Sequence, residues 1–245
     1  MKLTVFENYH DLSARVAEEI ISLVSDKPKA LFTIATGDTP KGAYDHLAKL
    51  AHERNVDFSK AYFAALDEWV GVPRDNPGSC YSFLNAHLFD RVPFSKKNIS
   101  LFDVSGDLNE ECERMDRFIS KNGPIELMVV GVGINGHVGF NEPALPPHTF
   151  SFIAELAEST KKVGQKYFPS AVNLKQGLSL GFKHFFQAKK VIVIANGSHK
   201  ADIVFSALNA VDSAGIPVTL LRRHKNAYLW VDRPAAEKLQ KTSSQ

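Results

Sequence analysis

The chain has 245 residues, of which 44% are hydrophobic and 23% are charged. This composition is typical of a globular protein with a sizeable core, and it argues against an intrinsically disordered chain. The formal net charge of +2 argues against nucleic acid or an anionic membrane surface as a partner. A small anionic substrate stays open, because a few local cations suffice to bind it.

The expected location of the chain follows from features that the sequence lacks. Its two cysteines, Cys80 and Cys112, are too few for a disulfide framework, and residues 1–10 contain no apolar signal-peptide core. No apolar run approaches the roughly 18 residues that a transmembrane helix requires. We therefore expect a cytoplasmic protein without a membrane partner, and the sequence leaves a homo-oligomer open.

Short apolar runs alternate with helical patterns along the chain. Strands are predicted, in chain order, at residues 2–6, 30–34, 61–66, 126–130, 190–194 and 228–231. A helix is predicted over 12–24 with Asp11 as its candidate cap, and further helices at residues 40–50, 80–89, 110–119, 198–207 and from 233 onward. This alternation predicts an α/β fold, with one doubly wound domain over residues 1–245 and a mostly parallel, Rossmann-like sheet.

In such a sheet, ligands bind beyond the carboxyl ends of the strands. Two of these strand ends suggest a phosphate site. After Ile34, Gly37 lets backbone N–H groups approach an anion and Thr39 adds a hydroxyl. After Ile194, Lys200 lies in the first turn of a helix, where a cation opposes the helix dipole unless an anion offsets it. The alternatives are a plain capped turn and a solvated surface lysine.

A third strand end carries two carboxylates. Asp67 and Glu68 follow Leu66, and acidic residues at that place point into the ligand crevice. One of them could act as a general base if burial tunes its pKa. The alternative is that they cap a helix or order a loop.

The fourth strand end carries a glycine-rich run, residues 131–143. It formally matches the dinucleotide fingerprint, but Gly139 and Pro143 cut short the helix that such a fingerprint opens. The pairing of His137 with Glu142 is more informative, because a histidine shuttles protons near neutral pH and a carboxylate can fix its tautomer. No metal-ligand spacing accompanies this pair, so we expect no metal site.

These four segments together resemble the glucosamine-6-phosphate deaminase family, which shares its fold with the 6-phosphogluconolactonases. The resemblance runs in order through nearly the whole chain, over residues 35–40, 66–71, 81–83, 131–143 and 197–200. The run Gly-His-Val-Gly-Phe-Asn-Glu-Pro at 136–143 is the most specific part. The lactonases typically continue after Gly-His with a Thr-Ala-Ser-Leu-Phe-Pro-like sequence instead.

The resemblance implies an aldose–ketose isomerisation with loss of ammonia, which converts an amino-sugar 6-phosphate into a ketose 6-phosphate without a cofactor. It implies that Asp67 moves a proton between C2 and C1, and that His137 opens the sugar ring with Asn135 and Glu142 orienting it. The small-molecule partner is then a sugar phosphate. The residues implied to hold its phosphate are Gly37, Asp38, Thr39, Lys166 and Lys200.

Four departures from the family pattern favour a divergent branch. Asp38 stands where the phosphate loop usually has a second glycine, and a carboxylate repels a phosphate dianion unless it points away. Lys166 aligns with the arginine that binds the phosphate in the family. Lysine keeps the positive charge but cannot make the paired hydrogen bonds of a guanidinium. Asn135 replaces an aspartate of some members, and residues 149–152 replace a stretch whose arginines make allosteric or phosphate contacts in some. Together with the stretch from Leu-Asp-Glu-Trp at 66–69 to Pro-Gly-Ser-Cys at 77–80, Asp38 makes the chain look closer to members associated with galactosamine-6-phosphate.

Three functions on this fold are therefore weighed. The first is a deaminase/isomerase acting on glucosamine- or galactosamine-6-phosphate. The second is a 6-phosphogluconolactonase-type hydrolase, which residues 140–143 disfavour. The third is a non-catalytic sugar-phosphate sensor, in which a complete acid–base set would be unneeded. Residues 144–159 lack a clean period and follow the catalytic loop, so they are the candidate for a mobile lid.

Overall fold

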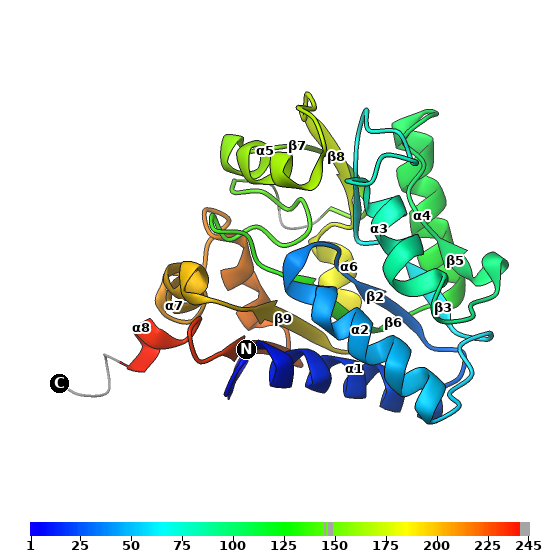
Figure 1. The fold of residues 1–245 in the computed structure, drawn as a ribbon. Coiled ribbons are helices and arrows are strands. Elements are labelled where there is room, and N and C mark those ends of the chain that lie inside the picture. Colours follow the sequence, from blue (N-terminus) through cyan, green and yellow to red (C-terminus); the bar gives the residue numbers. More distant parts are fainter. Residues whose placement is uncertain (145, 147–148, 241–245) are drawn as a thin grey trace.

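The computed structural model describes residues 1–144, 146 and 149–240. Its centre is a sheet of seven parallel strands in the order β1-β10-β9-β6-β2-β3-β5 (Figure 1). The strands are β1 (Lys2–Phe6), β2 (Leu31–Ile34), β3 (Tyr62–Ala64), β5 (Ile99–Ser100), β6 (Ile125–Gly131), β9 (Val191–Ala195) and β10 (Ala227–Asp232). From β2 the chain runs to one side through β3 and then returns to β6 on the other, so the strand order reverses between β2 and β6. This arrangement confirms the predicted α/β fold.

Helices flank the sheet. Figure 1 shows α1 and α2 side by side along one face, while α4 packs against β3 and α6 against β6. The helices are α1 (Tyr9–Asp26), α2 (Asp38–Glu53), α3 (Cys80–Leu84), α4 (Leu108–Asn122), α5 (Glu158–Gly164), α6 (Phe182–Gln187), α7 (Ala201–Asn209) and α8 (Glu237–Gln240). Shorter helical turns are the π-type η1 (Asn85–Phe89) and the 3₁₀-type η2 (Lys96–Asn98), η3 (Gln165–Tyr167), η4 (Ser198–Lys200) and η5 (Pro217–Arg223). Over the described ranges, none of the helices has the length and apolarity needed to span a membrane.

The first helix illustrates how sequence period and capping act together. Its buried side chains, among them Leu12, Val16 and Ile20, recur at helical spacing and face the core. The prediction that Asp11 caps this helix is wrong. The cap is Asn8, whose side chain accepts a hydrogen bond from the Asp11 N–H at 2.9 Å. Asp11 lies in the first turn, where its carboxylate faces the positive end of the helix dipole.

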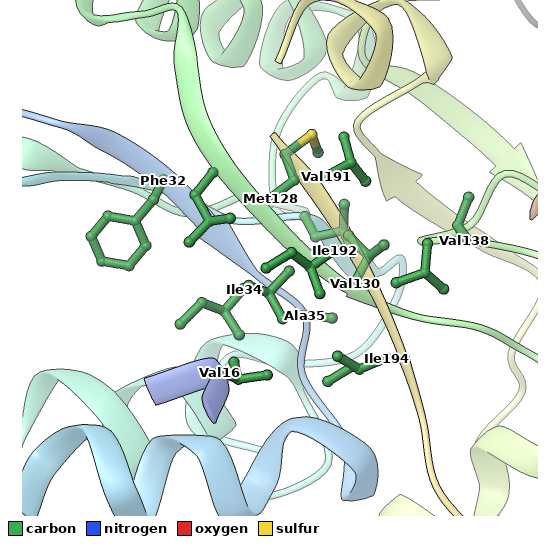
Figure 2. Close-up of a cluster of buried hydrophobic side chains, with 14 of the residues drawn as sticks. Val16, Phe32, Ile34, Ala35, Met128, Val130, Val138, Val191, Ile192 and Ile194 are labelled. Atoms are coloured by element: carbon green, nitrogen blue, oxygen red, sulfur yellow. The ribbon is translucent and has the colours of Figure 1, made fainter. Parts of the chain in front are cut away.

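The core is centred on β2, β6 and β9. Strands covered by helices on both faces consist of continuous apolar runs, and all residues of β2 and β9 are buried. Figure 2 shows Ile34, Val130 and Ile192, one from each of these strands, gathered in the same cluster. Each fully buried side chain of this size stabilises the fold by about 1.5–3 kcal/mol. These strands therefore form a tightly packed core, and the loops that follow their carboxyl ends are anchored to it.

A second, antiparallel sheet was not predicted. It has three strands in the order β4-β8-β7, with β4 at Asp67–Trp69, β7 at Phe152–Glu155 and β8 at Gln176–Ser179. Figure 1 shows β7, β8 and α5 projecting away from the large sheet. The small sheet has its own buried apolar cluster, which comprises Trp69, Val72, Cys80, Phe140, Ala154, Leu156, Phe168 and Leu174.

The structure changes three predictions. The strand predicted over 61–66 ends at Ala64, and Asp67 begins a new strand rather than following an old one. The helix predicted over 80–89 changes from α-helical to π-helical at Asn85. The segment 144–159, in which the sequence has no clean period, contains β7 and the start of α5, while its residues 145, 147 and 148 lie outside the described part. Its role as a mobile lid stays a prediction. The single-domain assignment stays a prediction.

Candidate active site

Asp67 and Glu68 are neighbours on β4, so their side chains point to opposite sides of the strand. Glu68 is 3% exposed and accepts hydrogen bonds from three backbone N–H groups. These are the N–H groups of Trp69 and Cys80, each at 2.9 Å, and of Tyr81 at 2.7 Å. The alternative considered for the acidic pair, a loop-ordering role, therefore describes Glu68, which fixes the start of α3.

Asp67 has a different environment. Its side chain is only partly exposed, and its Oδ1 lies 3.5 Å from the Cys80 Sγ. Burial raises the pKa of Asp67 to about 7, the charge of Glu68 adds to this rise, and the hydrogen bond from Cys80 opposes it. A carboxyl group with a pKa near neutrality can both take up and release a proton at cellular pH, as a general base requires.

The His137 loop leaves the carboxyl end of β6 as a series of turns. The Gly133 N–H donates to the His137 carbonyl at 2.9 Å, and Gly136 has a φ of +88°, which favours glycine. A Cβ atom on Gly133 would lie 2.2 Å from the His137 Cε1, so the imidazole rests directly on this glycine. The glycines of this run thus serve the histidine, and no helix begins within residues 131–143, all of which are described. This outcome agrees with the argument against a dinucleotide fingerprint.

A hydrogen-bond network orients the imidazole. The Asn135 Oδ1 accepts from the His137 backbone N–H at 3.1 Å and lies 2.7 Å from its Nδ1. The Asn135 Nδ2 donates to the Glu142 Oε2 at 2.9 Å and to the Ser159 Oγ at 3.1 Å. The Thr160 Oγ1 lies 3.2 Å from the same Nδ1. The structure thus brings together the predicted residues Asn135, His137 and Glu142, and it adds Ser159 and Thr160, which sequence reasoning missed.

The charge state of His137 follows from its surroundings. Its pKa is lowered because burial disfavours the imidazolium, and although the Glu142 carboxylate opposes this effect, the ammonium of Lys200 adds to it. Glu142 is 4% exposed, and its Oε2 lies 3.6 Å from the His137 Nδ1. A neutral imidazole at physiological pH can accept a proton on one nitrogen while the other is held by a hydrogen bond.

The predicted phosphate loop begins α2. Gly37 precedes this helix with a φ of +101°, so Asp38 and Thr39 lie in its first turn, where backbone N–H groups are unpaired within the helix. The Thr39 Oγ1 donates to the Asn196 Oδ1 at 2.8 Å. Asn196 follows β9, so this bond joins the loop that follows β2 to the loop that follows β9.

Lys166 and Asp38 form an ion pair at the mouth of this loop. The Lys166 Nζ lies 2.6 Å from the Asp38 Oδ2, and both side chains are exposed. Burial alone would lower the pKa of Lys166, but the hydrogen bond to Asp38 and the neighbouring Tyr167 outweigh it and raise this pKa. Tyr167 closes over the loop, since a Cβ atom on Gly37 would lie 3.0 Å from its hydroxyl. The Asp38 carboxylate is therefore turned toward a cation.

Lys200 links the phosphate loop to the His137 loop. Its Nζ donates to the carbonyl of Val132, the residue after β6, at 2.8 Å. Burial lowers the pKa of Lys200 to about 8, and the charge of Lys166 contributes to this shift. The charges of the two predicted cations thus repel each other, and an anion nearby would relieve this repulsion. Over the described residues, no cluster of potential metal ligands is found.

Comparison with known proteins identifies the family. The family model for glucosamine-6-phosphate isomerases/6-phosphogluconolactonase matches residues 6–230. A glucosamine-6-phosphate deaminase of Clostridium botulinum (strain Hall) is 35% identical over 241 residues, which cover 98% of this chain and 99% of that protein. A glucosamine-6-phosphate deaminase of Thermoanaerobacter sp. (strain X514) is 32% identical over 238 residues, covering 96% of this chain and 94% of that protein.

Solved structures agree with the sequence comparison. A monomeric glucosamine-6-phosphate deaminase superimposes with a TM-score of 0.93 at 29% identity, covering 97% of this chain and 99% of that chain. The 6-phosphogluconolactonase of Thermotoga maritima matches with a TM-score of 0.74 at 21% identity, covering 94% and 98%, and this match concerns the fold alone. The chain belongs to the family of glucosamine-6-phosphate isomerases and 6-phosphogluconolactonases.

Proposed function

We propose that this protein is an amino-sugar-6-phosphate deaminase, which converts glucosamine-6-phosphate and water into the ketose 6-phosphate and ammonia. The observation that carries the proposal is the presence of both a carboxyl group with a pKa of about 7, Asp67, and an oriented neutral imidazole, His137. Further support comes from the relatives named glucosamine-6-phosphate deaminase, which align over nearly the whole chain.

His137 opens the sugar ring in this proposal. The Asn135 amide is oriented by Glu142, which can only accept, so Nδ2 faces Glu142 and Oδ1 faces the imidazole. Nδ1 therefore carries the hydrogen, and Nε2 is the lone-pair nitrogen. Nε2 takes the proton of the C1 hydroxyl and returns it to the ring oxygen, which yields the open-chain aldehyde.

Asp67 then moves a proton between two carbons. Its carboxylate removes the proton from C2, which the neighbouring aldehyde acidifies, and an amino-enolate forms. The resulting carboxylic acid returns the proton to C1, and a proton passes from the nitrogen to O1, which leaves a hydroxyl at C1 and an imine at C2. Water hydrolyses this imine to the ketone and ammonia, so atoms and charge balance without a redox step or a cofactor. A pKa of about 7 suits a group that must be base and then acid within one cycle.

The phosphate occupies the other end of the site in this proposal. Three features support this placement: the first-turn N–H groups of α2, the ammonium of Lys166 beside Asp38 in that turn, and Lys200, whose pKa is lowered by the charge of Lys166. A helix N-terminus with two neighbouring cations is a favourable environment for a phosphate dianion. For Lys166 to contribute, its ammonium must turn from Asp38 toward the substrate.

The choice of sugar belongs to the proposal as well. Glucosamine-6-phosphate is favoured by the names of the relatives, and the Asp38 variant of the phosphate loop motivates galactosamine-6-phosphate as the second substrate to test. We also place the protein in the cytoplasm, because Cys80 and Cys112 are both free thiols.

The decisive experiment measures ammonia release from glucosamine-6-phosphate and galactosamine-6-phosphate side by side, with 6-phosphogluconolactone hydrolysis as a third assay. We expect turnover of at least one amino sugar and none of the lactone. His137→Gln should abolish turnover, whereas the matched control His52→Gln, at an exposed position of α2, should retain it. Lactone hydrolysis at enzymatic rates, or no release of ammonia from either sugar, would contradict the proposal.

A further inference from the structure

One buried thiol has no part in the proposed chemistry and yet contacts its base. Cys80 is the first residue of α3 and is 4% exposed. Its Sγ accepts a hydrogen bond from the Thr36 Oγ1 at 3.3 Å and donates one to the Asp67 Oδ1 at 3.5 Å. Thr36 directly precedes Gly37 of the phosphate loop. A continuous hydrogen-bond chain therefore runs from the phosphate loop through a single sulfur atom to Asp67.

The position of this sulfur is fixed by the strand that carries Asp67. Glu68 accepts from the backbone N–H groups of Cys80 at 2.9 Å and Tyr81 at 2.7 Å. Glu68 thus holds the first turn of α3 against β4, while the adjacent Asp67 receives the thiol. Because Glu68 is buried and its acceptors are engaged, Cys80 has little freedom to move away from Asp67.

We propose that Cys80 is a positioning residue for the proposed base, and that its thiol, held by Thr36, fixes the Asp67 carboxylate and ties it to the phosphate loop. The inference rests on the proposed function, because it takes Asp67 as the base. Burial raises the pKa of the Cys80 thiol well above its usual range, so the thiol stays protonated and acts as a donor. A donor to a carboxylate favours its ionised form.

A thiol suits this role better than a stronger donor. Because S–H is a weak donor, it orients the carboxylate while leaving its pKa near neutrality. The Thr36 hydroxyl that donates to the sulfur strengthens the S–H donor through cooperativity. Removal of either member should therefore move the ionisation of Asp67 to higher pH, and removal of both should add little to the loss of Cys80.

Other ionisable groups near Asp67 do not supply this hydrogen bond. Glu68 on β4 raises the pKa of Asp67 by its charge. Tyr44 of α2 is buried, its pKa is raised well above the usual range by burial, and its hydroxyl donates to the carbonyls of Ile34 and Ala35. Within the described part of the chain, Cys80 is therefore the side chain that donates to the Asp67 carboxylate.

The test is the pH profile of kcat for ammonia release from glucosamine-6-phosphate by the wild type, Cys80→Ala, Thr36→Val and the double variant. We expect the acid limb of Cys80→Ala to move upward by about 0.5–1 pH unit. Thr36→Val should move the acid limb less in the same direction, whereas Thr36→Ser, which keeps the hydroxyl, should leave it at the wild-type position. The double variant should have the same acid limb as Cys80→Ala. Thr33→Val is the matched control. It removes a buried hydroxyl that donates to the Ala64 carbonyl and has no part in the hydrogen bonds from Thr36 through Cys80 to Asp67.

The outcomes separate this inference from the proposed function. An active Cys80→Ala enzyme whose acid limb stays in place would overturn the role of Cys80, even if its kcat fell at every pH. If the acid limb of the double variant moved by the sum of the two single shifts, the proposed hydrogen-bond chain from Thr36 through Cys80 would be overturned. Should Cys80→Ala fail to fold, Thr36→Val still decides, because Thr36 is only partly buried and valine keeps its shape. A wild type without turnover would overturn the function instead.

Discussion

The two proposed proton carriers have contrasting surroundings. Among the residues that the structure describes, the Asp67 carboxylate has one weak side-chain donor, Cys80, and its environment acts on it mainly by excluding water. The His137 imidazole is instead surrounded on its Nδ1 side by Asn135, Thr160 and Glu142, within 2.7–3.6 Å. Exclusion of water shifts the pKa of a carboxyl group, whereas a hydrogen-bond network selects the tautomer and orientation of an imidazole. The shifted pKa suits Asp67, a proposed base that must also release its proton. The fixed tautomer suits His137, which is proposed to open the ring.

The largest effect should follow from replacing the isolated group. Asp67→Asn keeps the size of the side chain but cannot take a proton, so turnover should fall by about 10³-fold or more. C2 proton exchange, followed by NMR in heavy water, should be lost as well. Asp45→Asn, an exposed change on α2, is the control and should retain exchange. Exchange that persists in Asp67→Asn would exclude Asp67 as the base.

The same variant should gain stability. Folding raises the pKa of Asp67 from 3.8 to about 7, so the folded protein binds the proton more tightly than the unfolded chain. Asp67 therefore costs stability as pH rises from about 4 to 7, and the cost is complete above that range. The melting temperature of Asp67→Asn should be higher than that of the wild type at pH 8, and the two melting temperatures should converge below about pH 4.

Breaking the network at His137 should act on both activity and stability. Asn135→Leu removes the acceptor that holds Nδ1 and the donor that satisfies Glu142, so kcat should fall by roughly 10²-fold. Because Glu142 is buried, the loss of its donor should also cost about 1–3 kcal/mol in the free energy of unfolding. Kinetics and urea unfolding measure the two losses. A variant with normal unfolding and normal kcat would show that the network is dispensable.

The pH dependence of kcat and KM in the wild type should distinguish the ionisation of the proposed base from that of the proposed phosphate site. Below about pH 7, kcat should fall by about ten-fold per pH unit as Asp67 becomes protonated. Above about pH 8, KM should rise because Lys200 loses its charge. Steady-state kinetics from pH 5 to pH 10 test both limbs. A KM that is constant to pH 10 would argue against a role of the Lys200 charge in binding.

The smallest effect is expected at the exposed ion pair. Asp38→Asn frees Lys166 for the substrate and removes a repulsive charge, so KM should fall by about 3- to 10-fold with kcat nearly unchanged. Salt should reduce the difference, because the pair is exposed to solvent. Asp45→Asn removes another α2 carboxylate, one paired with Arg91, and should leave KM in place. A higher KM in Asp38→Asn would mean that Asp38 assists binding.

The sequence predicts the large sheet better than the small one. Strands such as Leu31–Ile34 and Val191–Ala195 are buried on both faces, so their apolar runs are visible without knowledge of their neighbours. The strands β4 and β7 are three and four residues long and become strands only through pairing with β8. Such pairing depends on partners distant in the chain, which local patterns do not encode.

The same limit applies to the site. Strand ends and chemical type select His137 and Lys200 as candidates, whereas they select Asp67 for the end of a strand that in the structure ends at Ala64. Cys80 and Thr160 could not be selected in this way, because their side chains act only through contacts that packing creates. The resemblance to a family supplied roles for the first group, and it gave no signal for the second.

The alternation along β4 has a consequence for how this chain tolerates insertions and deletions. Asp67 pairs with Ser179 and Glu68 with Leu178, and each carboxylate has its function because of the side of the strand it occupies. A shift of one residue in this register would exchange the two carboxylates, placing the longer glutamate side chain at the position of the proposed base and an aspartate at the start of α3. The length of the connection from Ala64 to Asp67 is therefore under the same constraint as the proposed base itself. Loop-length variation within the family should concentrate elsewhere.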